Sequence, residues 1–505
     1  MNSAPESSPE PSPEPSREKT PTPLDVLLPV LVLIGCLLLL LNSFSDNAGG
    51  YTQLALVAAA ITACLVGLKN RVTWAELEDG MINSVTSGLK AILVLLVVGG
   101  LVGSWILAGT VPAMIYWGTQ LLSPQWFYPA AALICAVTGL SIGSSWTVAG
   151  ALGVGLMGVA SVMGLSPAIT AGAILSGAYM GDKLSPLSDT TNLAAGVTGN
   201  DLFRHIRHMG WTTIPAFVIS LLVFVVVGSG GGELNGDLGG EIVAVNRLLG
   251  EQFYLGLPVF VPLLVVLTLA LLRKPVLPAL MAGMVAGVLV ALLFQTPQVT
   301  SLGGGEGDGV MIKGVAIALM DGFAIESGNS MVDDLLSKGG MGNMLSTVFL
   351  IICALTFGGA FERAGLLKRA VDGILNRVKT VGGLISATLA TSFGVNVTCA
   401  DQYISVVMPA RMYKDAYRQR GLHPLNLSRA VEDAGTITSV LIPWNTCGIY
   451  MAGVLGVTAW GWGSGLGAFA YAPWAIFCWL CPIISAIYGY TAFKVLPLKT
   501  EPEAG

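Results

Sequence analysis

The stretch GDKLSPLSDTTN (residues 181–192) places two carboxylates, a lysine and several hydroxyls between apolar segments of the chain. Such polarity at membrane depth is costly unless it lines a cavity. Pro186 lacks an amide hydrogen and clashes with the preceding turn, so we expect a helix to break near Leu184 to Ser188 and to release backbone carbonyls. Carbonyl, hydroxyl and carboxylate oxygens are hard ligands for a small cation, so the stretch predicts an ion site. The alternative is a polar loop outside the membrane, which fits poorly between the turn at Gly164 and the basic loop at Arg204.

The flanking sequence is typical of a membrane protein. Of the 505 residues, 53% are hydrophobic and only 11% are charged, which excludes a water-soluble globule. Apolar runs of about 20 residues, long enough to cross roughly 30 Å of hydrocarbon as helices, recur along the chain and are too long for barrel strands. We predict an all-α polytopic membrane protein whose clearest spans are residues 24–44, 51–68, 91–108, 211–227, 254–272, 276–293, 344–361 and 474–493.

The positions of lysine and arginine predict the orientation of these spans. If the N-terminus is cytoplasmic, every Lys and Arg falls inside except Arg247, Lys313 and Lys338 outside and Lys183 within the membrane. We therefore expect a multi-pass protein of the cell (inner) membrane with both termini in the cytoplasm. No basic patch suited to nucleic acid accompanies the spans.

The chain also contains an internal repeat at an offset of 257 residues. Residues 164–199 align without a gap over residues 421–456, with glycines and prolines in step, as in Gly164 over Gly421 and Pro186 over Pro443. Each half is predicted to make five net crossings, one of them a discontinuous helix, and to carry one re-entrant hairpin. Because five is odd, the second repeat is expected to be inverted, with the transport site at the interface of the two.

This repeat defines the expected domains. A proline-rich, disordered cytoplasmic tail (1–23) precedes transmembrane repeat 1 (24–228), an exterior linker (229–253), transmembrane repeat 2 (254–493) and a second cytoplasmic tail (494–505).

The second half has its own predicted break at IPWNTCG (residues 442–448), where Asn445 and Thr446 take the positions of Ser188 and Asp189. One or two turns earlier, Glu432 and Asp433 can each share a helix face with Thr436. Glu432 has an alternative partner, because Arg429 precedes it by three residues and favours a plain ion pair. The second break therefore contributes polar groups from a different part of its helix.

Before each broken helix lies a pair of short apolar arms with a polar tip, residues 128–163 around SIGSSW and residues 382–412 around VNVTCADQY. Arms of about 15 residues indicate re-entrant hairpins rather than full spans. Their tips are expected to meet the broken helices at the midplane through Ser144, Ser145, Asn396, Thr398 and Asp401. For any single hydroxyl the alternative is a bond to its own helix or to a neighbouring one.

Histidine and cysteine add no predicted site. His205, His208 and His423 are expected to be surface residues in cytoplasmic turns, with pH sensing as the alternative. Cys478 and Cys481 have CxxC spacing, but no second ligand pair lies nearby, so the eight cysteines are interpreted as buried small hydrophobic residues. The adjacent Glu362 and Arg363 are expected to be structural.

Two stretches, SGAYMGDKLSPLSDTTNLA (residues 176–194) and EDAGTITSVLIPWNTCG (residues 432–448), closely resemble the signatures of the NhaC-type sodium/proton antiporters. The likeness covers roughly residues 24–496. It implies two inverted repeats in which a transport domain moves against a scaffold like an elevator. It also implies exchange of sodium for protons, although the same family includes exchangers of malate for lactate.

The resulting prediction is a secondary active transporter that exchanges sodium ions for protons. One carboxylate binds either ion in turn. Asp189 is expected to be that residue and to bind sodium, because it follows Pro186 in the broken stretch, whereas Asp182 is adjacent to Lys183, which can act as its counter-ion. The residues expected to bind the ion or proton are Asp182, Ser185, Ser188, Asp189, Thr190, Asn192, Asp401, Glu432, Asp433, Thr436, Asn445 and Thr446.

Other functions fit the residues less well. The alternative substrate is a small carboxylate or an amino acid, exchanged with sodium and protons, for which Lys183 is the only cationic candidate at the midplane. A channel is disfavoured by the paired repeats, and an enzyme by the lack of a nucleophile, base and orienting group together. No cofactor is expected, and the partners are the lipid bilayer, sodium ions and protons. The oligomeric state is left open, with a homodimer as one option.

Overall fold

A computed structural model describes residues 19–44, 51–230, 238–375, 378–458 and 470–498. These residues form helices and their connections, with one isolated β-bridge between Leu422 and Pro497. Nine of the described helices are long and apolar enough to cross a membrane, or up to 11 if each of two bent helix pairs is one span. The predicted all-α membrane class is therefore confirmed.

The first half contains the helices that surround the first break. In chain order they are α1 (Pro23–Phe44), α2 (Thr52–Lys69), α3 (Trp74–Ser87), α4 (Leu89–Leu107), α5 (Thr110–Leu121), α6 (Phe127–Ile142), α7 (Ser145–Val148), a π-helical segment (Ala149–Gly153), α8 (Val154–Val162), α9 (Pro167–Leu184), α10 (Asp189–Thr198) and α11 (Leu202–Gly230).

The second half follows with α12 (Leu238–Gln252), α13 (Val261–Leu271), α14 (Val276–Phe294), α15 (Thr296–Leu302), α16 (Val310–Met320), α17 (Ser330–Leu336), α18 (Leu345–Arg363), α19 (Leu366–Leu375), α20 (Val381–Cys399), α21 (Gln402–Gln419), α22 (Pro424–Val431), the π-helical segment η6 (Glu432–Thr436), the short 3-10 helix η7 (Ser439–Leu441), α23 (Thr446–Leu455) and α24 (Ile476–Thr491).

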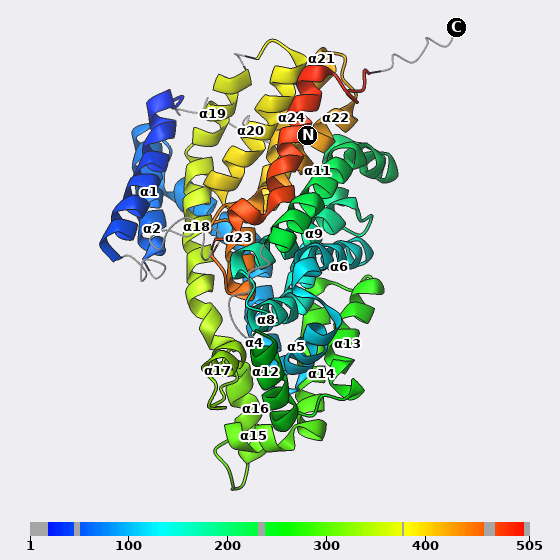
Figure 1. The fold of residues 1–505 in the computed structure, drawn as a ribbon. Coiled ribbons are helices and arrows are strands. Elements are labelled where there is room, and N and C mark those ends of the chain that lie inside the picture. Colours follow the sequence, from blue (N-terminus) through cyan, green and yellow to red (C-terminus); the bar gives the residue numbers. More distant parts are fainter. Residues whose placement is uncertain (1–18, 45–50, 231–237, 376–377, 459–469, 499–505) are drawn as a thin grey trace, which may run out of the picture.

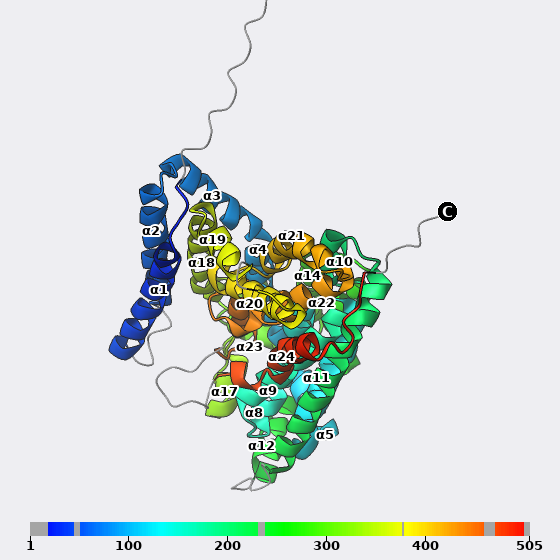
Figure 2. The ribbon, with the colours of Figure 1, turned by 90° about the horizontal axis from the view of Figure 1, so that it is seen from above.

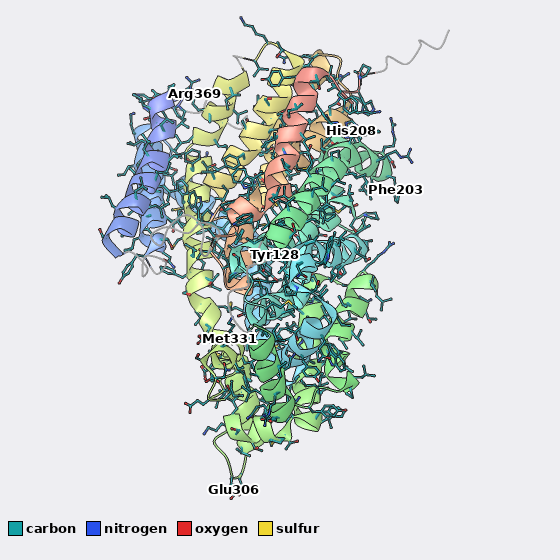
Figure 3. All side chains as sticks on the ribbon, viewed as in Figure 1. Tyr128, Phe203, His208, Glu306, Met331 and Arg369 are labelled. Atoms are coloured by element: carbon teal, nitrogen blue, oxygen red, sulfur yellow. The ribbon has the colours of Figure 1, made fainter. Side chains whose placement is uncertain are left out.

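The helices form an elongated bundle (Figure 1). Helices α1 and α2 stand together at one edge beside α18 and α19, and the view from above shows the same edge (Figure 2). Helices α15 to α17 lie at one end of the long axis, and α21 and α22 lie at the other. Glu306 accordingly marks one extremity, while Arg369 and His208 lie toward the opposite one (Figure 3).

Exposed leucines cover the outside of the bundle, for example Leu24 on α1, Leu222 on α11 and Leu293 on α14. On a membrane protein such side chains face lipid rather than water. Inside, glycine permits close packing: a Cβ added at Gly177 of α9 would lie 2.0 Å from the carbonyl oxygen of Ala132 on α6. Small residues thus let α9, which carries the first break, lie directly against α6.

Backbone landmarks recur at the offset of 257 residues. Gly164 and Gly421 both turn the chain with φ of 63°, and Gly199 and Gly456 end α10 and α23 with φ of 73° and 69°. The turn before each hairpin's second arm is also left-handed, at Gly143 and at Ala400. The sequence repeat therefore corresponds to a repeat of local structure.

An ion pair fixes the amphipathic helix α3 to α18. Thr73 caps α3, and its backbone and side-chain hydrogen bonds, aided by Arg363 of α18, lower the pKa of the Glu76 carboxyl. The guanidinium of Arg363 lies 2.5 Å from that carboxylate. The pair gives Arg363 the structural role that the sequence indicates.

Candidate functional site

The first break forms where Pro186 predicts it. Helix α9 ends at Leu184, Ser185 is extended, and α10 begins at Asp189 after the N-cap residue Ser188, whose hydroxyl accepts the Thr191 amide at 3.4 Å. The side chain of Asn192 donates to the carbonyls of Pro186 (2.9 Å) and Ser188 (2.7 Å). Asn192 therefore holds the shape of the break by bonding the Pro186 carbonyl and adding a second bond to the Ser188 carbonyl, which already accepts the Asn192 amide at 3.1 Å.

The second break is built differently. Its first arm runs through α22, η6 and η7 to Leu441, and α23 then leaves at an angle of 46°. Asn445 caps α23 by accepting the Cys447 amide at 3.0 Å. The π-helical segment η6 carries Glu432, Asp433 and Thr436, all buried, before the break. Single wide turns of this kind often occur at functional sites.

The two hairpin turns supply polar caps that face the breaks. Ser144 accepts the Thr147 amide at 3.3 Å, and Asp401 accepts the Ile404 amide at 2.9 Å. The hydroxyl of Thr398 donates to the Gly394 carbonyl of its own helix at 2.9 Å. This is the alternative to a site role that we gave for any single hydroxyl. Each turn therefore places an oxygen at the start of a helix whose free amides it satisfies.

A cavity of about 470 Å³ joins these elements. It is lined by several residues of each hairpin turn, by both sides of the first break and by the start of α23. The predicted site residues among its walls are Ser144, Asp182, Ser188, Asp189, Thr190, Asn192, Asp401 and Thr446. The other predicted residues, Ser145, Lys183, Ser185, Asn396, Thr398, Glu432, Asp433, Thr436 and Asn445, are not part of this lining.

Asp182 is the carboxylate most firmly attached to a hairpin turn. One of its oxygens, Oδ2, accepts both the amide of Ser145 at 2.9 Å and its hydroxyl at 2.7 Å. The side chain is almost completely buried, with 8% exposure, yet it lines the cavity. Asp182 therefore connects the first break to the first hairpin turn and still faces the cavity.

Lys183 has a different partner from the one expected. Its ammonium pairs with Asp433 of the second half, not with Asp182, and both side chains are fully buried. Thr212 of α11 donates to the same Asp433 oxygen at 3.0 Å, and Cys481 of α24 lies 2.8 Å from the ammonium. The expected neutralisation of Asp182 by Lys183 is therefore wrong. Cys481 does not only fill space as a small buried side chain, because its thiol also contacts the Lys183 ammonium.

Asp189 lies at the open end of the cavity. Its side chain is 65% exposed, and one carboxylate oxygen lies 3.3 Å from the ammonium of Lys90 at the start of α4. Lys90, Arg273 and Lys274 all belong to the lining of the cavity, and all three are exposed. The sequence interpretation counted these three only as cytoplasmic charges, although Lys90 directly precedes an apolar span and Arg273 and Lys274 lie between two.

Glu432 joins the second half to the first break. It is fully buried, and its Oε1 accepts the hydroxyl of Thr190 at 3.0 Å, while Thr190 in turn lies 3.2 Å from Ser188. Arg429 instead donates to the backbone carbonyl of Lys494 at 3.1 Å. The alternative ion pair between Glu432 and Arg429 is therefore absent from the described residues.

The structure also corrects the interpretation of two histidines. His205 and His208 are buried, with 0% and 5% exposure, although both were expected on the surface. They lie in the first turns of α11, which pack against α22. The sequence does not indicate this burial, because both histidines lie next to arginines in a segment that is predicted to be a cytoplasmic turn.

The described residues contain no group of three or more His, Cys, Asp or Glu side chains that could hold a metal ion as a resident cofactor. The acids are instead spread around the cavity, mixed with hydroxyls and backbone carbonyls. Such a set of hard oxygens suits an alkali cation that binds and leaves again.

A helical membrane protein in which two broken helices and two hairpin turns meet at one cavity that contains three carboxylates has the features of a polytopic membrane transporter. A family model described as "Na+/H+ antiporter family" matches residues 177–493. The chain belongs to this family, and the resemblance to its NhaC-type members is confirmed.

Three relatives show the breadth of the group. The Na(+)/H(+) antiporter NhaC of Alkalihalophilus pseudofirmus is 35% identical over 88% of this chain and 91% of its own. The arginine/ornithine antiporter ArcD of Halobacterium salinarum is 38% identical over 84% of this chain and 83% of its own. The malate-2H(+)/Na(+)-lactate antiporter of Bacillus subtilis is 33% identical over 93% of this chain and 95% of its own.

Proposed function

We propose that this protein exchanges sodium ions for protons across the cell membrane. The observation that carries the proposal is the cavity between the two hairpin turns, in which Asp182, Asp189 and Asp401 are the carboxylates. A carboxylate that binds either a proton or a cation, and never both, couples the two movements by competition. Membership of the Na+/H+ antiporter family supports the same exchange.

Within this cavity we assign the shared role to Asp182 and a neighbouring role to Asp189. The sequence favours Asp189 because it follows Pro186 and because Lys183 lies next to Asp182, but Lys183 pairs with Asp433. Asp182 is shielded from water and is attached to a hairpin turn, whereas Asp189 is exposed and pairs with Lys90. A shielded carboxylate must replace the lost hydration by a proton or an ion, which is the property that exchange requires.

We further propose two inverted repeats that form a transport domain and a scaffold, which move past each other like an elevator. The recurrence of turns and caps at the offset of 257 residues supports the repeats. The basic residues predict cytoplasmic termini, and the cavity opens beside Lys90, Arg273 and Lys274. The conformation is accordingly proposed to be open to the cytoplasm.

Cysteine labelling tests this orientation. A cysteine at Gly304 should react with an impermeant thiol reagent from outside the cell, and one at Lys274 should react only from the cytoplasm. Labelling of the two positions from the exchanged sides would contradict the proposed topology. Closed, leak-free vesicles are the control.

The exchange is tested in everted membrane vesicles that hold a proton gradient, followed with a pH-sensitive dye. Addition of sodium should release the gradient with the wild-type protein and not with Asp182→Asn, which keeps the side-chain shape but cannot titrate. The variant should be present in the membrane in normal amount. A wild-type protein that moves no protons when sodium is added would contradict the proposal.

A second candidate, exchange of small carboxylates with sodium and protons, is favoured by one observation. Three basic side chains at the mouth of a cavity of about 470 Å³ suit an organic anion better than a bare cation. The same vesicles distinguish the two functions. If malate or lactate must be present before sodium moves protons, the carboxylate exchanger is the better description.

A further inference from the structure

Glu432, on the π-helical segment η6, is a fully buried carboxyl group that lies beside the ion site without lining the cavity. Its Oε1 accepts the hydroxyl of Thr190 at 3.0 Å. Its Oε2 is buried and has no hydrogen-bond partner among the described residues. Asp182, by comparison, lines the cavity and accepts both an amide and a hydroxyl of Ser145. The two acids therefore differ in both access and hydrogen bonding.

The charges around Glu432 leave it without a positive partner of its own. Lys183 and Asp182, both of α9, act on its carboxyl group. The Lys183 ammonium is already paired with Asp433, the next residue of η6. Arg429 of α22 also faces Asp433, and its Nε and Nη2 atoms have no hydrogen-bond partner among the described residues. A carboxylate without a positive partner is costly to bury, so Glu432 carries a proton in this conformation.

Two threonine hydroxyls meet the Glu432 carboxyl group, that of Thr190 and that of Thr436 on the same wide turn. The Thr436 hydroxyl is also buried without a hydrogen-bond partner among the described residues. A hydroxyl can donate to an ionised carboxylate or accept from a protonated one. The surroundings of Glu432 therefore fit a carboxyl group that gains and loses a proton. At Asp182 the Ser145 amide can only donate, which suits a carboxylate that also binds a cation.

A single side chain separates Glu432 from the cavity. Thr190 belongs to the cavity lining, and its hydroxyl lies 3.2 Å from the hydroxyl of Ser188, which also belongs to the lining. A hydroxyl can accept a proton from one neighbour while it gives its own proton to another. Each contact between the cavity wall and Glu432 therefore joins two described side chains.

The same surroundings suit a proton better than a sodium ion. Hard cations in proteins take about six or more oxygen ligands. On η6 the side-chain oxygens that are buried without a partner are one each from Glu432, Asp433 and Thr436. The part of the chain that the structure describes also has no group of three or more His, Cys, Asp or Glu side chains that could hold a metal ion. We therefore consider a proton as the ligand of Glu432.

We propose that Glu432 is a second proton-binding site, which exchanges its proton through Thr190, while Asp182 binds sodium or a proton in the cavity. This inference rests on the proposed sodium/proton exchange. In the release step the O–H bond of Glu432 breaks and its proton bonds to the Thr190 oxygen, which passes its own hydroxyl proton into the cavity. Sodium at Asp182 favours this release, because its positive charge lies beside both acids. Each sodium ion then exchanges for two protons, one from each acid.

The ratio of protons to sodium ions tests the proposal, because a ratio does not depend on the rate of transport. The full-length protein is placed in lipid vesicles whose membrane potential is held at zero. At a pH difference of about one unit, two protons per sodium ion balance a sodium gradient of about a hundredfold, and one proton balances about tenfold. We expect the wild-type protein to balance the larger gradient.

Glu432→Gln imitates the neutral acid, since its amide can donate to Thr436 and its carbonyl can accept from Thr190. The variant should still exchange sodium for protons, but the balanced gradient should fall about tenfold, to the value for one proton. The matched control is Glu362→Gln, at the end of α18 and outside the cavity lining, which should keep the wild-type gradient. A wild-type gradient that fits one proton, or an unchanged gradient in Glu432→Gln, would overturn the second proton site.

Thr190 gives an independent test if Glu432→Gln folds poorly. Thr190→Val removes the hydroxyl between Glu432 and the cavity and should also balance the one-proton gradient, whereas Thr190→Ser should keep the wild-type value. Equal gradients in the two variants would overturn the proposal. A sigmoidal dependence of the wild-type rate on sodium concentration would also overturn it, by placing a second sodium ion at Glu432. A wild-type protein that moves no protons when sodium is added would instead contradict the proposed function itself.

Discussion

The two halves of the molecule share backbone turns at an offset of 257 residues but carry different chemistry at the equivalent positions. In the first half the acids Asp182 and Asp189 stand at the break, whereas the equivalent positions of the second half are Ser439 and Thr446. The second half instead carries Glu432 and Asp433 before its break, over Leu175 and Ser176 of the first. Each half therefore supplies acids where the other has neutral residues.

Two side-chain contacts join the halves through these differing residues. Thr190 of the first half donates to Glu432 of the second, and Lys183 of the first pairs with Asp433 of the second. None of these contacts has a symmetric copy, because the residues at the equivalent positions are of other types. These contacts make the proposed site asymmetric.

The contact between hairpin and broken helix differs in the same way. In the first half Gly139 packs so closely that an added Cβ would lie 2.9 Å from the Ala178 carbonyl oxygen. The equivalent Asn396 donates from its side chain to the equivalent carbonyl, that of Gly435, at 2.7 Å. The first half thus has a close backbone contact at this position, whereas the second half has a hydrogen bond from a side-chain amide to a carbonyl of η6.

The largest expected effect comes from substituting Asp182 and its equivalent in the second half, Ser439. Asp182→Asn should reduce sodium-dependent proton release by at least about a hundredfold, because the group that binds either ion is lost. Ser439→Ala, its counterpart in the second half, should have a much smaller effect. Proton release is measured with the dye assay at equal protein levels. Similar losses in both variants would show that the halves contribute equally.

The hydroxyl that joins the halves should matter next. Thr190→Val leaves a buried Glu432 oxygen without its donor, which costs about 1–3 kcal/mol and should lower exchange about tenfold. Thr170→Val is the control, because that hydroxyl donates only to Ser166 of its own helix. The comparison uses initial rates over a range of sodium concentrations. An equal effect of the two variants would remove the case for a functional bridge.

The hairpin contacts predict a stability difference. Gly139→Ala forces a methyl group against backbone atoms of Ala178 and Asp182 and should destabilise the protein by about 1–3 kcal/mol. Gly394→Ala, at a glycine of α20 with no atom within 4 Å of an added Cβ, is the control and should be neutral or slightly stabilising. Thermal unfolding in detergent measures both. A normal melting temperature for Gly139→Ala would mean that α6 and α9 separate easily.

The sequence predicted those parts of this comparison that depend on local rules. Apolar runs predicted most of the long helices, and Pro186 predicted the first break. The hairpin arms Pro124–Ile142, Ser145–Val162 and Val381–Cys399 are longer than expected, however, and are long and apolar enough to cross a membrane. Contacts between residues far apart in the chain were not predictable in this way. Proximity in the sequence predicts that Lys183 pairs with its neighbour Asp182. In the fold, however, its partner is Asp433, which lies far away in the chain. The burial of His205 depends on the packing of α22 and had no sequence signal.

The smallest expected effect concerns Lys90, which meets Asp189 at the mouth of the cavity and has no counterpart at the second break. Both side chains are more than half exposed, so their attraction is weak, about 0.2–1 kcal/mol. Sodium must displace the Lys90 ammonium to reach Asp189, so Lys90→Gln should lower the KM for sodium about twofold to fivefold with little change in kcat. Lys274→Gln, also in the cavity lining but without this partner among the described ion pairs, is the matched control. If both variants lower KM equally, the mouth acts through its total charge; if only Lys90→Gln does, the ammonium competes directly with sodium for the exposed acid of the first half.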